Sequence, residues 1–359
     1  MPLAFLEKTV PSEFSAIKGD YLRDILDQPQ ALERTLTGLE ESNRLAQLKE
    51  GLEKGQFKNV ILTGMGASFH ALHPLNLGLI EAGFTAFMVE TSELVHYQQR
   101  LLDSNNLIVA VSQSGQSAET VRLLEMIREK SAVVVAVTNT PEGPLAKQAA
   151  ATILTRAGKE FSVSCKTYVA ALTALQWLEA VLRGRDLRAT RGELQKAVAA
   201  AEAYLANWES HVESLVQMLQ GIHHLLLVGR GPSLAATGTG ALIVKESAHF
   251  PAESMSSAAF RHGPFEMLSR EILVLIFAGE KRTRTLNRRL FDDIRGQQGR
   301  AELVTEDAAG GPFAFPAVPQ NVQPILEILP VQMLTLALAA RAGREPGRFE
   351  RASKVTATE

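Results

Sequence analysis

A cluster of hydroxyl and amide side chains follows a strongly apolar run in the first half of the chain. The run Asn106–Val111 is rich in β-branched residues, which is typical of a strand buried on both faces. It continues into Ser112-Gln113-Ser114-Gly115-Gln116-Ser117, and a helical pattern begins with Ser117 as the predicted N-cap. The glycine permits a tight turn, and the first amides of a helix favour an anion. These side chains could therefore bind phosphate, although serines that only cap a turn would produce a similar pattern.

A second glycine-containing turn follows an earlier apolar run. Gly64 and Gly66 are separated by one residue, and Glu90 ends the next expected strand, where it could bind a ribose. The third glycine of the dinucleotide fingerprint is absent, because Phe69 occupies its position. A nucleotide site is therefore a weak interpretation, and Ser68 fits better as a second wall of the phosphate site.

Two ionisable residues in the second half could move protons. Glu246 lies beside Lys245 in the otherwise apolar helical pattern 240–248, and burial would raise the pKa of its carboxyl group. On the residues alone, an ordinary surface Lys–Glu pair is the simpler explanation. His262 precedes a Gly-Pro pair after a predicted loop, 251–261, so its ring is expected in a turn. The chain has no His/Cys cluster with the spacing of a metal site, so no metal is expected.

Strand-like and helix-like segments alternate around these residues, which predicts βαβ units and parallel sheets. A helical segment, 13–55, comes first, and a long Ala-rich helical segment, 187–219, lies between the two halves. The expected strands of the first half are 59–63, 84–90, 106–111, 132–137 and 152–154, with helices at 92–102 and 168–182.

The second half repeats the first. The segment 224–233 resembles 62–68, and Gly229 lies 165 residues after Gly64 (229 − 64), which is the length of one domain. A predicted strand, Ile272–Phe277, occupies the place of the 106–111 strand but continues into Ala-Gly-Glu-Lys. No serine cluster follows it, and Glu280 would repel phosphate. We therefore expect one phosphate site per chain, in the first half.

Taken together, these motifs resemble those of the double-SIS (sugar isomerase) family. The resemblance covers the chain from about Lys49 to the C-terminus. It rests on the duplicated halves and on four motifs, which are Ser112-Gln113-Ser114-Gly115-x-Ser117, Lys245-Glu246, His262-Gly263-Pro264 and Lys354-Val355-Thr356. The pattern is similar to the isomerase half of glucosamine-6-phosphate synthase and to stand-alone phosphosugar isomerases and deaminases. It implies an α/β fold of two tandem SIS domains, each a mostly parallel five-stranded sheet flanked by helices in a flavodoxin-like three-layer arrangement.

The resemblance also implies an activity, without a cofactor. A hexose or hexosamine 6-phosphate would be isomerised by ring opening and proton transfer between C1 and C2, through an enediol or enolamine. The alternatives are an aminosugar-6-phosphate deaminase and a non-catalytic phosphosugar-binding regulatory protein. Glu246 would be the base, His262 would open the ring of a neighbouring subunit's substrate in a homodimer, and Lys354 would lie over the open-chain sugar. Phosphate would bind Ser68, Ser112, Gln113, Ser114 and Ser117, and Gly66, Ala67 and Val163 would contact the sugar.

The chain departs from the pattern of these relatives at three positions. On the helix that carries Glu246, Thr239 and Ile243 replace a glutamate and a lysine of the synthase, and Ala259 replaces a glutamate of some deaminases. No glutaminase domain is expected before the repeat. Synthase activity is therefore not expected, deaminase activity is in doubt, and isomerase activity is less affected.

The overall composition indicates a cytoplasmic globular protein. With 359 residues and a formal net charge of −2, the chain gives no reason to expect nucleic acid or a membrane as partner. Cys165 is the single cysteine, which fits a reducing compartment, and the N-terminus lacks the apolar core of a signal peptide. The longest apolar runs have the length of strands. The expected parts are a helical lead-in at 1–48, a phosphate-binding first SIS domain at 49–186, a linker helix at 187–221, a second SIS domain with the catalytic Glu and His loop at 222–345, and a tail with Lys354 at 346–359.

Overall fold

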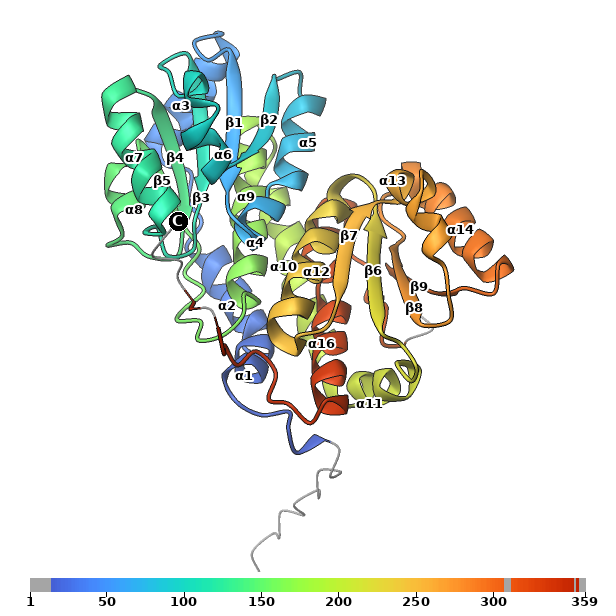
Figure 1. The fold of residues 1–359 in the computed structure, drawn as a ribbon. Coiled ribbons are helices and arrows are strands. Elements are labelled where there is room, and N and C mark those ends of the chain that lie inside the picture. Colours follow the sequence, from blue (N-terminus) through green and yellow to red (C-terminus); the bar gives the residue numbers. More distant parts are fainter. Residues whose placement is uncertain (1–13, 307–310, 352, 355–359) are drawn as a thin grey trace, which may run out of the picture.

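The computed structural model describes residues 14–306, 311–351 and 353–354, which form two sheets in two adjoining halves (Figure 1). The first sheet has the strand order β2-β1-β3-β4-β5, with all neighbours parallel. Its strands are β1 (Asn59–Gly64), β2 (Ala86–Glu90), β3 (Asn106–Val111), β4 (Val133–Thr138) and β5 (Ala151–Leu154). The order reverses between β1 and β3, and ligands bind at such a switch point in open α/β sheets.

The second sheet repeats this topology. Its order is β10-β9-β8-β6-β7, so each half has the flavodoxin-like order 2-1-3-4-5 when its strands are counted along the chain. The strands are β6 (His224–Gly229), β7 (Ala252–Ser256), β8 (Ile272–Phe277), β9 (Arg300–Glu306) and β10 (Ala314–Phe315). The predicted fold of two parallel five-stranded sheets is therefore confirmed.

Helices cover both faces of the first sheet. Three N-terminal helices, α1 (Asp20–Leu26), α2 (Gln28–Thr37) and α3 (Asn43–Glu53), precede it, and α2 and α3 pack on α9 (Lys166–Leu182). The others are α4 (Ala67–His70), α5 (His73–Glu81), α6 (Thr91–His96), η2 (Gln99–Leu101), α7 (Ala118–Lys130) and α8 (Pro144–Gln148). The side chains of β1 alternate between two cores: Val60 and Leu62 face the core that contains α9, whereas Ile61 faces the smaller core on the other side of the sheet.

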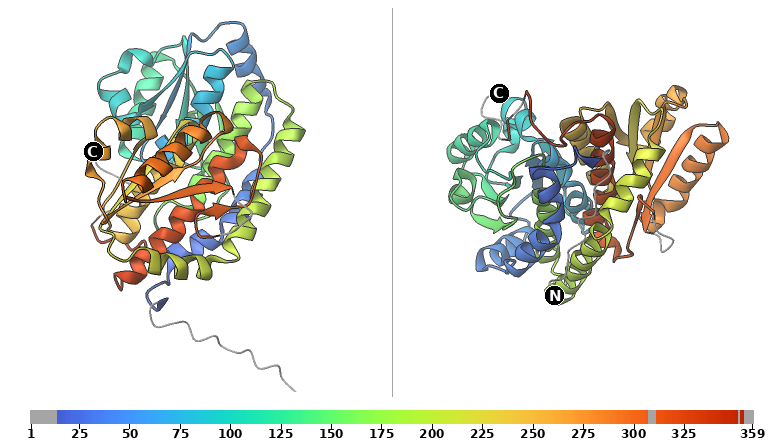
Figure 2. Two further views of the ribbon diagram at one scale, coloured as in Figure 1. Left: turned by 90° about the vertical axis from the view of Figure 1, so that its right-hand side faces the viewer. Right: turned by 90° about the horizontal axis from the view of Figure 1, so that it is seen from below.

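The helices of the second half begin with α10 (Leu187–Leu205) and α11 (Trp208–Met218). Figure 2 shows α10 in yellow-green between the halves, and it contacts α2 and α9 on one side and α15 and α16 on the other. The rest are η3 (Gly231–Ser233), α12 (Leu234–Ala248), α13 (Ser257–Arg261), η4 (Pro264–Met267), α14 (Lys281–Gly296), η5 (Gln320–Val322), α15 (Gln323–Glu327) and α16 (Leu329–Arg341). One continuous apolar core joins both halves through α9, α12 and α16.

Three sequence expectations were wrong in detail. The segment 251–261 is not a loop but β7 followed by α13, whose N-cap Ser256 accepts a hydrogen bond from the amide of Ala259. The strand was missed because β7 lies at the sheet edge, where Glu253 and Ser254 are exposed and break the apolar pattern. The helix expected at 92–102 is divided into α6 and η2, and the helical segment 187–219 is divided into α10 and α11.

A long apolar helical stretch was also missed. The stretch Gln320–Arg341 is long and apolar enough to cross a membrane by length and composition, so the apolar runs are not all of strand length. Its apolar window is completely buried inside the protein, however, and a core helix passes the same test. We therefore assign this stretch to the core shared by the two halves.

The C-terminal tail returns from α16 to the first half, where Figure 1 shows it in red passing α1. The amide of Gly347 donates to the carbonyl of Ser247 on α12 (3.0 Å), and the hydroxyl of Ser162 donates to the carbonyl of Gly347 (2.5 Å). The tail thus connects α12 to the segment between β5 and α9. Val355 and Thr356 of the predicted tail motif lie outside the described residues.

Candidate functional site

The turn between β3 and α7 gathers the predicted phosphate-binding hydroxyls. Ser117 is the N-cap of α7, as predicted, and its hydroxyl accepts from the amide of Thr120 (3.4 Å). The hydroxyl of Ser112 accepts from the amide of Gly115 (3.1 Å), whose φ of 65° suits glycine. The hydroxyl of Thr120 lies 2.9 Å from that of Ser117 and donates to that of Ser112 (3.3 Å). Thr120, which the sequence reading did not single out, therefore links the two serines.

The ends of β1 and β4 form the surroundings of this turn. The carbonyl of Gln113 accepts from the amide of Asn139 (3.1 Å), which follows β4. A narrow cleft of about 20 Å³ is lined by Ala67 and Ser68 from one side and by Gln113 from the other. The fold thus brings these three predicted residues together at the carboxyl end of the first sheet, at the switch point between β1 and β3.

The helix α12 of the second half extends over this end of the first sheet. A Cβ atom added at Gly66 would lie 3.4 Å from Leu242 of α12, so the β1 turn and α12 approach closely. Glu246, near the end of α12, lines a cavity of about 370 Å³ together with Lys245 and residues of the tail. Burial raises the pKa of the Glu246 carboxyl above its usual value. The Lys354 ammonium opposes this rise, the Glu160 carboxylate adds to it, and Lys245 opposes it.

Lys354 is anchored where the tail passes the first half. Its side chain is 24% exposed, and its ammonium is hydrogen-bonded to the carboxylate of Glu160 and donates to the carbonyl of Ser162 (2.6 Å). Lys354 and Glu246 are close enough for the charge of the lysine to lower the pKa of the glutamate. The predicted base and the predicted lysine therefore belong to one electrostatic cluster.

Glu160 belongs to this cluster but was not predicted. Its side chain is completely buried and accepts from the amides of Cys165 (2.9 Å) and Thr167 (3.0 Å) and from the hydroxyl of Thr167 (2.7 Å). A cavity of about 570 Å³ is lined by both Glu160 and Gln113. The one signal available in the sequence was an acidic residue shortly before a helix N-terminus, where the helix dipole favours negative charge.

The side chains of two predicted site residues, Val163 and His262, line none of the cavities described above. The side chain of Val163 is buried in the core, so any contact with a ligand would involve its backbone. His262 is exposed in the turn after α13 and lines none of the cavities described here. Within the described ranges of the chain, no three His, Cys, Asp or Glu side chains gather as metal ligands.

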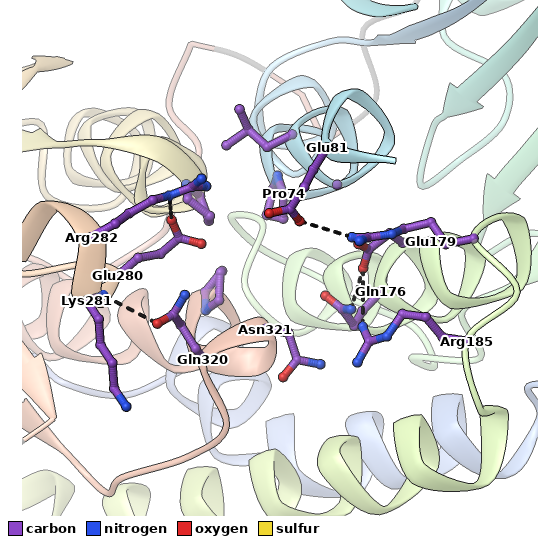
Figure 3. Close-up of a pocket in the computed structure, with 15 residues that line it drawn as sticks. Pro74, Glu81, Gln176, Glu179, Arg185, Glu280, Lys281, Arg282, Gln320 and Asn321 are labelled. Carbon is purple, nitrogen blue, oxygen red and sulfur yellow. Dashed lines mark hydrogen bonds and ion pairs between the residues drawn. The ribbon is translucent and has the colours of Figure 1, made fainter. Parts of the chain in front are cut away.

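The second half has a counterpart of this site, shown in Figure 3. This cavity of about 540 Å³ lies at the carboxyl ends of β6 and β8 and is lined by Glu280 there and by Glu81 of α5 from the first half. Glu81 precedes Glu246 by 165 residues (246 − 81), so the two glutamates hold corresponding positions in the two halves. Ser233, the counterpart of Ser68, is buried and donates to Glu327 (2.8 Å). None of the predicted site residues lines this cavity.

Comparison with curated proteins identifies relatives of the whole chain. The glutamine–fructose-6-phosphate aminotransferase (isomerizing) of Pyrobaculum aerophilum is 28% identical over 373 residues, which cover 99% of this chain and 61% of that protein. The enzyme of the same name from Pyrococcus horikoshii is 27% identical, with coverage of 96% and 59%. The chain thus spans about three fifths of the length of these relatives.

Solved structures have the same fold. A candidate phosphosugar isomerase from Silicibacter pomeroyi DSS-3 has a TM-score of 0.75 and 27% identity, covering 91% of this chain and 99% of that chain. The tagatose-6-phosphate ketose/aldose isomerase of Escherichia coli has a TM-score of 0.79 and 20% identity, covering 94% and 98%. Residues 56–179 match the model of the SIS domain. The first half therefore matches the SIS domain, and the second half repeats the topology of the first.

Proposed function

We propose that this protein is a phosphosugar isomerase that acts on a hexose or hexosamine 6-phosphate. The main observation is Glu246, a partly buried carboxylate with a raised pKa that lies in the field of the Lys354 ammonium, on the helix α12, which packs against α4 after the β1 turn. A general base works best when its pKa approaches the working pH. The names of the relatives, which describe aminotransferase, isomerase and deaminase reactions of sugar phosphates, support the same substrate class.

The proposed reaction begins with phosphate binding. Ser68, Ser112, Gln113, Ser114 and Ser117 bind the 6-phosphate, helped by the amides at the N-terminus of α7. Gly66, Ala67 and the backbone of Val163 contact the sugar. These contacts fix the positions of C1 and C2 relative to Glu246. The binding energy of the phosphate, which is remote from the reacting carbons, contributes to their orientation.

Proton transfer then occurs in the open-chain form. Glu246 takes the proton from the carbon next to the carbonyl and returns it to the adjacent carbon, so that an enediol, or an enolamine for an aminosugar, forms in between. The Lys354 ammonium stabilises the negative charge that develops on the enediolate oxygen. No cofactor is part of this proposal.

Ring opening is assigned to His262 of a neighbouring subunit. The exposure of this histidine, in a turn that lines none of the cavities described above, supports a role in a second copy. We therefore propose a homodimer in which each site is completed by the other chain. A cytoplasmic location is proposed as well, because the single cysteine suits a reducing compartment.

A substrate panel in deuterated water tests this function. Hexose and hexosamine 6-phosphates are incubated with the protein, and isomer ratio, ammonia and deuterium at C2 are followed. Glu246→Gln should keep phosphosugar affinity and lose exchange at C2 by roughly 10²–10⁴-fold, as expected for a general base, whereas Glu213→Gln, an exposed change on α11, should not. Activity should also fall as the pH drops through the raised pKa of Glu246, because the base must be ionised.

Two outcomes would contradict the proposal. Release of ammonia with every turnover would indicate a deaminase. Tight phosphosugar binding without exchange at C2 in the unmodified protein would indicate a regulatory binding protein.

A further inference from the structure

The segment between β5 and α9 contains a buried carboxylate that connects the first half to the tail. One oxygen of Glu160 accepts from the amides of Cys165 and Thr167 at the start of α9. The other accepts from the Thr167 hydroxyl (2.7 Å) and binds the Lys354 ammonium. The amides hold the carboxylate in one orientation, so one of its oxygens presents a fixed negative charge to the lysine.

The tail is held at a second point close to Glu246. Gly347 donates its amide to the carbonyl of Ser247, the residue after Glu246, and accepts from Ser162 (2.5 Å). Lys354 in turn donates to the carbonyl of Ser162 (2.6 Å). The tail therefore crosses from α12 to the segment that carries Glu160, and Lys354 is its last described attachment.

From these contacts we infer that Glu160 is a positioning residue, which holds the Lys354 ammonium beside Glu246 during the proposed reaction. This inference rests on the proposed function. Glu160 is not assigned a contact with substrate; it acts through the lysine. A lysine side chain has four rotatable bonds, and its orientation over the sugar depends on an anchor of this kind.

The charges around Glu246 predict how removal of Glu160 affects the base. Three of them act on its pKa: Lys354 and Lys245 lower it, and Glu160 raises it. His249, Glu350 and Arg351 line the same cavity, and Tyr21 is close enough for the Glu246 charge to raise the tyrosine pKa. Removing the lysine should raise the pKa of Glu246, and removing the negative charge of Glu160 from a protein that already lacks the lysine should lower it.

The test is a double-mutant cycle between Glu160→Gln and Lys354→Met. Glu160→Gln should lower kcat at least tenfold with a smaller change in KM. Lys354→Met should shift the acid limb of the pH profile to higher pH, and Glu160→Gln added to it should shift that limb to lower pH. In the Lys354→Met background, Glu160→Gln should cause no further loss of kcat, because the lysine through which it acts is already gone.

A control variant distinguishes the effect of the Glu160 charge from the effect of its hydrogen bonds on local structure. Thr167→Val removes one hydrogen bond from Glu160 but leaves its charge, so the acid limb should stay where it is in the unmodified protein. The inference is overturned if Glu160→Gln reduces kcat by the same factor with and without Lys354, since the carboxylate would then act only by supporting α9.

Amide hydrogen exchange of the tail tests this inference independently of the proposed function. Glu160→Gln and Lys354→Met should each speed amide exchange at 346–354, the double variant should add nothing, and Arg351→Gln should have no effect. This readout holds even if no sugar phosphate is turned over. If Glu160→Gln fails to fold, the comparison of Lys354→Met with Arg351→Gln tests the inference. Equal rates of amide exchange in the tails of these two variants would overturn it.

Discussion

Three glutamates of this chain differ in what surrounds their carboxyl groups. Glu160 is buried but accepts hydrogen bonds from two amides, a hydroxyl and an ammonium. Glu327 is buried with fewer donors, Ser233 and Gln323, and burial raises its pKa to about 7. Glu246 is only partly buried, so its pKa is raised while it stays accessible to a ligand. These surroundings suit Glu246, and neither of the others, to exchange protons with a substrate.

The serine turn is tested by removing two hydroxyls. Ser112→Ala combined with Ser114→Ala should weaken phosphosugar binding by about 10²–10⁴-fold, because hydrogen bonds to a charged phosphate are lost together. Titration calorimetry measures this loss. Glu280→Ala, at the corresponding turn of the second half, should leave affinity unchanged. Unchanged phosphosugar affinity in the serine variant would show that the phosphate does not bind at this turn.

Glu327 should make stability depend on pH. Its folded pKa of about 7 lies above the usual 4.5, so the folded state binds more protons between these values. Its contribution to stability is therefore present below pH 4.5 and is lost as the pH rises through 7, by up to about 3 kcal/mol. Glu327→Gln should be more stable than the unmodified protein at pH 8 and lose this advantage at pH 4.5.

Urea unfolding of both proteins at the two pH values measures the difference, in which the titration of other groups cancels. Glu213→Gln, an exposed change, serves as control. An advantage of Glu327→Gln that does not change with pH would mean that the folded pKa of Glu327 is not raised.

At the scale of elements, the parts of the candidate site that come from the first half lie between the end of a strand and the start of a helix. β3 ends before the serine turn and α7, β1 ends before Gly66 and α4, and β5 is followed by Glu160 and α9. Because parallel strands end at the same edge of a sheet, these turns converge. The helix α12 adds Glu246 from the second half. Rigid elements thus determine the spacing of the site, and the turns provide its polar groups.

Two glycines with similar backbone angles test whether the turn geometry matters for binding. Gly115 has φ 65°, and an added Cβ would lie 3.3 Å from both Leu145 and Thr138; Gly55 has φ 70° and open space around it. Alanine at either position should cost about 1–2 kcal/mol of stability for the left-handed backbone. Gly115→Ala should in addition weaken phosphosugar binding severalfold.

Denaturant unfolding and titration calorimetry measure the two effects. Equal affinities of the Gly115→Ala and Gly55→Ala proteins would show that the turn tolerates distortion.

At the scale of the whole molecule, the two halves are arranged as pseudo-symmetric partners with different polar groups. The cleft at the end of the first sheet is lined by Ser68 and Gln113, and Glu246 lines a separate cavity with residues of the tail. The cavity of the second half is lined by Glu280 and by Glu81 of the first half. The shared core of α9, α12 and α16 fixes this arrangement. The described part of the tail then brings Lys354 to Glu160 of the first half, and Lys354 does not line the cavity of the second half.

Subunit mixing tests the proposed role of His262. Chains with Glu246→Gln and chains with His262→Ala should each be inactive, because each dimer lacks the same group in both sites. In a mixed dimer, one site contains both defects and the other contains neither. Random exchange should therefore restore about a quarter of the unmodified activity. Demonstrated exchange without any recovery would place His262 in the site of its own chain or exclude it from the reaction.

The sequence by itself determined the features that depend on neighbouring residues. The apolar β-branched runs predicted most strands, the glycines predicted the turns, and Ser117 was correctly predicted as the N-cap of α7. These features follow from local backbone preferences and hydrogen bonds within a few residues. The motifs also predicted the SIS domain, whose model matches residues 56–179.

Only the tertiary structure decided which groups meet across the chain. Lys354 and Glu160 are 194 residues apart, and nothing near either residue in the sequence indicates that they pair. The burial that raises the pKa of Glu246 likewise depends on where α12 lies, and the local pattern was equally that of a surface Lys–Glu pair. Long-range contacts are set by the path of the whole chain and by the core that holds it, so no local sequence signal contains them.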